Sequence, residues 1–129
     1  IGTNPRIVLK PFIKEMDQAY SIADLMVCRA GAMTLTEINL YGLPSILIPL
    51  PSAAANHQEF NARSQEKAGA ARVMLESELA EGAFLPLLTD IFTNKEKLTS
   101  MAQASATLKR PQATQEICDS IIRIASTCA

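Results

Sequence analysis

Three side chains that follow a predicted buried strand have the types and the spacing to bind an anionic ligand. The strand is the apolar run at residues 25–28, and Arg29 comes directly after it. Gly31 then allows a tight turn into a helical pattern that carries Thr34 and, one turn further on, Glu37. A helix that begins after such a turn presents free backbone N–H groups and the positive end of its dipole to an anion. Together with the cation of Arg29, the hydroxyl of Thr34 and the carboxylate of Glu37, such a helix start predicts a nucleotide-diphosphate site.

The elements that position these side chains alternate between strands and helices. The helix that begins after Gly31 is expected to end at Gly42 and Pro44, because both residues commonly terminate helices. The apolar run at 45–49 lacks polar alternation, as buried strands of parallel sheets do. This alternation predicts an α/β fold with a doubly wound parallel sheet, whose ligands lie at the carboxyl ends of strands, where loop 50–56 is also expected. The expected strands are 6–10, 25–28, 45–49 and 71–75, and the expected helices are 15–23, 33–41, 57–67, 81–92, 95–108 and 111–127.

The last expected helix carries an apolar stripe. Ile117, Ile121, Ile124 and Cys128 recur at helical spacing, and Pro111 suits the first turn. We expect this stripe to pack in the hydrophobic core or against another domain.

The composition excludes several classes of protein. The 129 residues are enough for one domain with a sizeable core, and 48% hydrophobic with 19% charged residues argues against disorder. A net charge of -1 and an aromatic content of 5% without Trp give no support for nucleic-acid binding. No apolar run approaches the roughly 20 residues of a membrane span. Three cysteines without CxxC spacing favour a reducing compartment, and Cys28 is expected to be an inert thiol of the core.

The chain lacks the motifs of several catalytic and cofactor sites. It has a single histidine, His57, and no G-x-S-x-G sequence, so a serine hydrolase has no support. The histidine and the cysteines lack the spacing of metal ligands, and neither G-x-G-x-x-G nor a P-loop is present. We therefore predict no metal and no cofactor, and the residues alone indicate an anionic ligand at strand ends.

A set of short motifs extends through the middle of the chain. It consists of the segment from Cys28 to Glu37 (CRAGAMTLTE), residues 42–44 (GLP), Pro49, His57 with Gln58, Asn61 with Ala62, and residues 66–70 (EKAGA). In order and spacing these motifs closely resemble the MurG-type peptidoglycan N-acetylglucosaminyltransferases. Related sugar-nucleotide transferases often carry His where Arg29 stands, so the likeness is specific. It extends over nearly the whole chain.

This resemblance implies a fold and a reaction. The family has a GT-B fold of two Rossmann-like domains with the donor in the cleft, and it makes lipid II from lipid I with UDP-N-acetylglucosamine by an inverting transfer. The chain looks like the later part of the C-terminal, donor-binding domain, a Rossmann-like parallel sheet with helices on both faces. The full-length enzymes of the family are peripheral on the cytoplasmic face of the inner membrane.

The resemblance also implies roles for individual residues of the donor site. Ile13 matches the position that meets the uracil, and Arg29 would lie close to the phosphates. The helix start that holds the diphosphate corresponds to Ala32, Met33 and Thr34. Glu37 matches the carboxylate that accepts hydrogen bonds from the ribose hydroxyls. The positions that face the N-acetylglucosamine correspond to His57 and Gln58, with Asn61 one turn behind them.

Two parts of the family's enzymes are expected before Ile1. One is the glycine-rich loop with the first βαβ unit of the C-terminal domain. The other is the N-terminal domain, which binds the lipid acceptor, carries the membrane patch and supplies the expected catalytic base. We therefore expect no catalytic residue in this chain and no transfer by it alone. An open sheet edge at the strand around Ile7 would allow dimerisation.

Each predicted role has an alternative. Arg29 could pair with Asp24 or Glu37, Thr34 and Glu37 could be an exposed helix face, Ile13 a hydrophobic plug and His57 a structural residue. Two other functions also stay open: a stand-alone donor-binding subunit of a split transferase, and a non-catalytic α/β interaction module.

Overall fold

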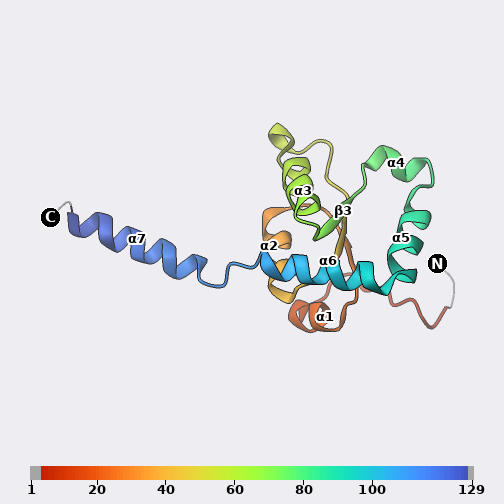
Figure 1. Cartoon of the computed structure of the whole chain (residues 1–129), viewed down its shortest axis with the longest axis horizontal. Helices are drawn as coiled ribbons and strands as arrows, with labels where there is room; N and C mark the ends of the chain where they lie inside the picture. Colours follow the sequence, from red (N-terminus) through yellow and green to blue (C-terminus); the bar gives the residue numbers. More distant parts are fainter. Residues whose placement is uncertain (1–3, 128–129) are drawn as a thin grey trace.

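A computed structural model describes residues 4–127 and contains a parallel sheet surrounded by helices (Figure 1). The three strands of the described sheet are adjacent in chain order, β1-β2-β3, and both pairs are parallel. This confirms the predicted α/β fold. The elements are α1 (Met16–Ile22), β1 (Met26–Cys28), α2 (Ala32–Tyr41), β2 (Ser45–Leu47), the 3₁₀ helix η1 (Ala54–Asn56), α3 (His57–Lys67), β3 (Ala71–Val73), α4 (Glu76–Ala80), α5 (Phe84–Thr93), α6 (Lys95–Thr107) and α7 (Ala113–Thr127).

The central strand β2 divides the hydrophobic core into two clusters, one on each face of the sheet. Successive strand residues point to opposite faces, so Leu47 and Ile46 lie in different clusters, and each has no exposed surface. The cluster of Leu47 is completed by α1, α2 and α3, and that of Ile46 by α4, α5 and α6. Helices therefore cover both faces, as the alternation of the sequence predicts.

The expected strand at 6–10 is absent, and this prediction is wrong. Residues 7–10 are irregular, and Val8 and Leu9 are 76% and 78% exposed. The N–H of Ile7 donates to the carbonyl of Asn4 in a local turn, at 3.0 Å. An apolar run becomes a strand only when a neighbouring strand takes its backbone groups, and among residues 4–127 this segment has none. The edges of the described sheet are β1 and β3 instead.

We expect a single helix at 81–92, but residues 81–83 form a turn after α4, and the helix of this segment, α5, begins only at Phe84. Gly82 has a φ of +76°, a conformation that Gly adopts without strain, and it separates α4 from α5. The separate helix α4 is missing from the sequence-based expectation. Its position matters, because α4 follows the carboxyl end of β3.

Helix α2 ends as predicted and packs closely on α6. Gly42 has a φ of +65°, and the N–H of Leu43 donates to the carbonyl of Ile38 at 2.9 Å. A Cβ at Gly42 would lie 3.3 Å from the Cβ of Ala106, so the glycine also allows the close approach of α6. The same interface contains a buried hydrogen bond, from the hydroxyl of Ser105 to the side-chain oxygen of Asn39 at 3.1 Å.

Replacing Ser105 by alanine is expected to lower the free energy of unfolding by about 1–3 kcal/mol. The substitution leaves the oxygen of Asn39, a residue only 6% exposed, without its buried donor. Urea unfolding followed by circular dichroism measures the change. Ser100→Ala is the matched control, because Ser100 is an exposed serine of the same helix that donates to a local carbonyl. Equal effects of the two substitutions would contradict the role of the buried pair.

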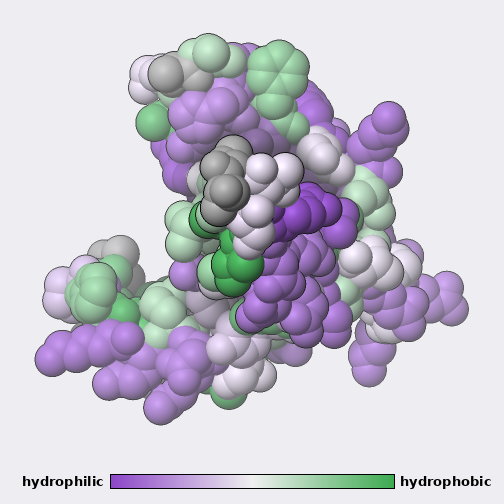
Figure 2. Space-filling view, turned by 90° about the vertical axis from the view of Figure 1, so that its left-hand side faces the viewer, coloured by the Kyte–Doolittle hydropathy of each residue, from purple (hydrophilic) through white to green (hydrophobic). Residues whose placement is uncertain are grey.

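The last helix projects away from the rest of the molecule (Figure 1). Helix α7 forms where expected, but Ile117, Ile121 and Ile124 are 61%, 61% and 62% exposed, so packing in the core is wrong for them, and packing against another domain stays a prediction. The segment around Pro111 interrupts the helix before it, so the chain leaves the body there. Seen from the side on which α7 projects, apolar residues lie beside strongly hydrophilic ones (Figure 2). Cys128 lies outside the described residues.

Within residues 4–127, no helix has both the length and the apolar character that a membrane crossing requires.

Candidate functional site

The beginning of α2 has the geometry predicted for an anion site. β1 ends at Cys28, and α2 starts at Ala32 with Gly31 as its N-cap residue. Gly31 has no side chain with which to cap the helix, and the first N–H groups of a helix have no acceptor within it. The N–H groups of Ala32, Met33 and Thr34 are therefore at the exposed positive end of α2. The hydroxyl of Thr34 lies 3.9 Å from the place of a Cβ on Gly31, close to this helix start.

Glu37 lies one turn further along α2 and contacts α1. Its Oε2 accepts a hydrogen bond from the hydroxyl of Tyr20 at 2.7 Å. Burial, this hydrogen bond and the charge of Glu37 raise the pKa of Tyr20 to about 12, so the phenol stays a donor at neutral pH. Tyr20 is only 5% exposed, whereas Glu37 is exposed. The carboxylate is thus held in place while it remains open to a ligand.

Arg29 is held by three acceptors at the carboxyl end of the sheet. Its NH1 group donates to the carbonyls of Ile48 and Pro49, at 3.3 and 3.2 Å, and to Oε2 of Glu76, at 3.0 Å. The expected alternatives, pairing with Asp24 or Glu37, are wrong because Glu76 is the partner. A phosphate contact by the remaining guanidinium N–H groups stays a prediction.

The start of α3 follows a strained turn. Ala55 and Asn56 have φ values of 49° and 55°, which residues with a Cβ rarely adopt. His57 then opens α3 and is exposed. Backbone outliers of this kind concentrate at ligand sites, where the surrounding structure maintains them.

Two further predicted residues of α3 tie it to the strand ends. Oε1 of Gln58 accepts a hydrogen bond from the N–H of Leu50 at 3.0 Å. Nδ2 of Asn61 donates to the carbonyl of Ala30 at 3.1 Å, and Ala30 is completely buried in the turn before α2. The starts of α2 and α3 are therefore held beside each other.

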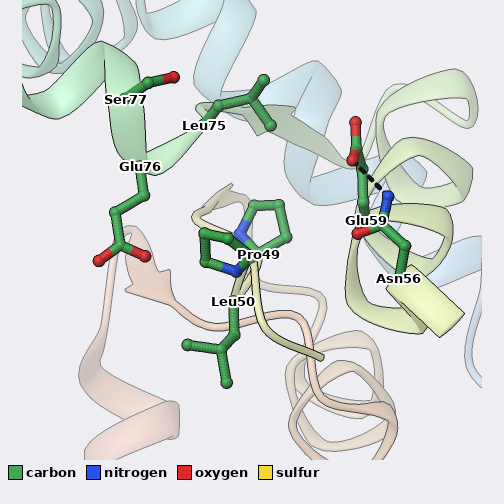
Figure 3. A pocket seen from close by; sticks show the side chains of 8 residues that line it. Pro49, Leu50, Asn56, Glu59, Leu75, Glu76 and Ser77 are labelled. Carbon is green, nitrogen blue, oxygen red and sulfur yellow. Dashed lines mark hydrogen bonds between the residues drawn. The ribbon is translucent and has the colours of Figure 1, made fainter. Parts of the chain in front are cut away.

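A cavity of about 370 Å³ lies at the carboxyl ends of β2 and β3. Figure 3 shows Glu76 and Ser77 of α4 on one side, Asn56 and Glu59 on the other, and Pro49 between them. None of the predicted site residues lines it directly. Arg29 and Gln58 adjoin it through their hydrogen bonds to Glu76 and Leu50, which both line it.

Ile13 lies apart from this cavity. It is in the irregular segment before α1, is 39% exposed, and lines a separate groove of about 460 Å³ with Val8, Leu9 and residues of α1. The sequence reasoning missed Glu76 and Tyr20, the partners of Arg29 and Glu37. Sequence distance gives no signal for either pair, since they are 47 and 17 residues apart.

No group of three metal-ligating side chains occurs among residues 4–127. The thiol nearest to the site, Cys28 at the end of β1, is partly buried, and burial raises its pKa to about 11.

We expect iodoacetamide at pH 8 to alkylate Cys28 at least about tenfold more slowly than Cys118. The raised pKa leaves little nucleophilic thiolate on Cys28, whereas Cys118 is exposed on α7. Peptide mass spectrometry over a time course measures each site separately. Equal rates in the folded protein would contradict the inert state of Cys28, and equal rates in urea serve as the control.

Comparison with known proteins identifies glycosyltransferases as relatives of this chain. The family described as "Glycosyltransferase family 28 C-terminal domain" matches residues 2–117. The enzyme of Desulforamulus reducens named UDP-N-acetylglucosamine--N-acetylmuramyl-(pentapeptide) pyrophosphoryl-undecaprenol N-acetylglucosamine transferase is 45% identical over 118 residues, which are 92% of this chain and 32% of that protein. The protein of the same name from Desulfitobacterium hafniense is 49% identical over 106 residues, 82% of this chain and 29% of its own length.

A crystal structure of MurG from Acinetobacter baumannii has the same fold in the matched part. It superimposes with a TM-score of 0.82 at 38% identity, over 88% of this chain and 33% of that one. The chain spans about a third of the length of these relatives.

Proposed function

Because the chain belongs to the family of glycosyltransferase family 28 C-terminal domains, we propose that it binds UDP-N-acetylglucosamine as the donor-binding part of an N-acetylglucosaminyltransferase. The observation that carries this proposal is the uncapped start of α2 at the end of β1, with Thr34 beside it and Glu37 one turn on. A diphosphate suits the N–H groups of this helix start, and a ribose diol suits a carboxylate. The relatives' printed names support the sugar nucleotide.

We place the remaining predicted residues around the same donor. Ala32, Met33 and Thr34 hold the diphosphate, Ile13 contacts the uracil, and His57 and Gln58 face the sugar. Asn61 supports this arrangement through the carbonyl of Ala30.

In the proposed reaction a hydroxyl of lipid I attacks the anomeric carbon of the donor sugar, and the bond to UDP breaks with inversion to give lipid II. Negative charge develops on the departing diphosphate. In this proposal the N–H groups at the start of α2 face the diphosphate and stabilise this charge, and the helix holds them in place before the reaction begins. The base, the lipid acceptor and a peripheral attachment to the cytoplasmic face of the membrane belong, in this proposal, to the remainder of the protein.

Calorimetric titration of the 129-residue chain with UDP-N-acetylglucosamine tests the proposal, with UDP-glucose as the control nucleotide. The expected result is saturable binding that is tighter for the N-acetyl sugar. Absence of binding in the chain and in a longer protein that contains its upstream segment would contradict a donor site. Binding only after a separate acceptor-binding chain is added would favour a split transferase.

A further inference from the structure

A single peptide unit after β2 is held from both sides. The carbonyl of Pro49 accepts from NH1 of Arg29 at 3.2 Å, and the N–H of Leu50 donates to Oε1 of Gln58 at 3.0 Å. These two backbone groups belong to one planar peptide, so they cannot turn independently. Arg29 and Gln58, which come from β1's end and from α3, therefore act on the same rigid plane.

The hydrogen bond from Leu50 fixes which way the amide of Gln58 points. An amide nitrogen cannot accept a hydrogen bond, so the atom facing the N–H of Leu50 must be Oε1. The two donor hydrogens on Nε2 are then directed away from the N–H of Leu50. If the peptide plane rotates, the N–H of Leu50 no longer faces Oε1, and the orientation of the Gln58 amide is no longer fixed.

Arg29 is itself anchored so that it can hold that plane. Its NH1 also donates to the carbonyl of Ile48, at 3.3 Å, and to Glu76 on α4, at 3.0 Å. These contacts connect the end of β1, the end of β2 and the start of α4. The sequence motif containing Arg29 predicts a phosphate ligand. In the structure, however, NH1 of Arg29 donates to protein acceptors.

We infer that Arg29 is a positioning residue for donor-sugar recognition. It orients the Pro49–Leu50 peptide, and through that peptide it presents the Nε2 donors of Gln58 to hydroxyl oxygens of the sugar. It does not hold the diphosphate. This inference rests on the proposed function, because it concerns the sugar end of the same donor site.

Titration of Arg29→Met with two nucleotides separates positioning from phosphate binding. The affinity for UDP-N-acetylglucosamine is expected to fall about tenfold, the equivalent of about one hydrogen bond, whereas the affinity for UDP stays within about twofold. An equal fall for both nucleotides, or no fall for either, would overturn the inference. Arg63→Met is the matched control, because Arg63 is an ion-paired arginine of α3 with similar side-chain exposure, 48% against 46%. It should change neither affinity.

A measurement without nucleotide tests the same inference independently of donor binding. In Arg29→Met the backbone amide of Leu50 should exchange with solvent about tenfold faster, and the two side-chain amide proton shifts of Gln58 should move toward those of an exposed glutamine. Neither change is expected in Arg63→Met. Unchanged Leu50 exchange and Gln58 shifts in Arg29→Met would overturn the inference. Failure of the wild-type chain to bind either nucleotide would count against the proposed function alone.

Discussion

Replacing Ile46 by alanine is expected to lower the free energy of unfolding by about 3 kcal/mol. Ile46 is the middle residue of the central strand, has no exposed surface, and packs against Met74, Ile91 and Met101. The substitution removes three methyl or methylene groups where the helices on that face meet the sheet, and helices fixed on a sheet collapse only partly into the cavity.

Urea unfolding measures this loss, and Ile122→Ala is the matched control. Ile122 lies on the projecting helix α7 and is 63% exposed, so the same chemical change there should cost no more than about 0.5 kcal/mol. If Ile46→Ala proves too unstable to purify, Ile46→Val should lose about 1 kcal/mol. Similar losses for Ile46→Ala and Ile122→Ala would contradict the position of β2 at the centre of the core.

Replacing Glu37 by alanine is expected to weaken the binding of both UDP and UDP-N-acetylglucosamine by roughly 10- to 100-fold. Both ligands share the ribose, and hydrogen bonds from its hydroxyls to an ionised carboxylate are stronger than those between neutral groups. The substitution also leaves the hydroxyl of Tyr20, a residue only 5% exposed, without its acceptor, so the free energy of unfolding should fall by about 1–3 kcal/mol while the apolar core stays packed.

Tyr20→Phe is the control that isolates the carboxylate. It removes the same hydrogen bond, from the hydroxyl of Tyr20 to Glu37, but keeps the negative charge at the site. Calorimetry should show less than about a fivefold loss of affinity for Tyr20→Phe. Unchanged affinity in Glu37→Ala, or an equal loss in both variants, would contradict direct ribose contact by Glu37.

Much of the fold follows from local signals in the sequence. The buried run around Ile46 and the αL glycine at Gly42 depend on a few neighbouring residues, and both are where the patterns predict them. The short turn at Gly31 is also local, so the uncapped start of α2 could be anticipated.

The features that the sequence could not predict depend on contacts between distant segments. The run at 7–10 has strand composition but no strand partner among residues 4–127, and the stripe of α7 has the period of a buried helix but projects into solvent. In both segments the apolar pattern shows that the segment could pack against another surface. Whether its side chains are buried depends on whether such a surface lies beside the segment.

The same distinction applies to the site. The sequence motif identifies Arg29 and Gln58, but their joint hold on the Pro49–Leu50 peptide depends on how β1, β2 and α3 are placed together. Glu76, the acidic partner of Arg29, follows β3 on a helix that the pattern at 81–92 does not predict.

The most direct test of the donor site is an amide-resolved NMR titration of the 129-residue chain with UDP-N-acetylglucosamine, with UDP-glucose as the control. We expect shifts at Ile13, at residues 32–37 and at His57 and Gln58, with larger changes near Gln58 for the N-acetyl sugar. Residues of α7 should not shift. Saturating shifts confined to other surfaces, or a folded spectrum that neither nucleotide changes, would contradict a donor site in this chain.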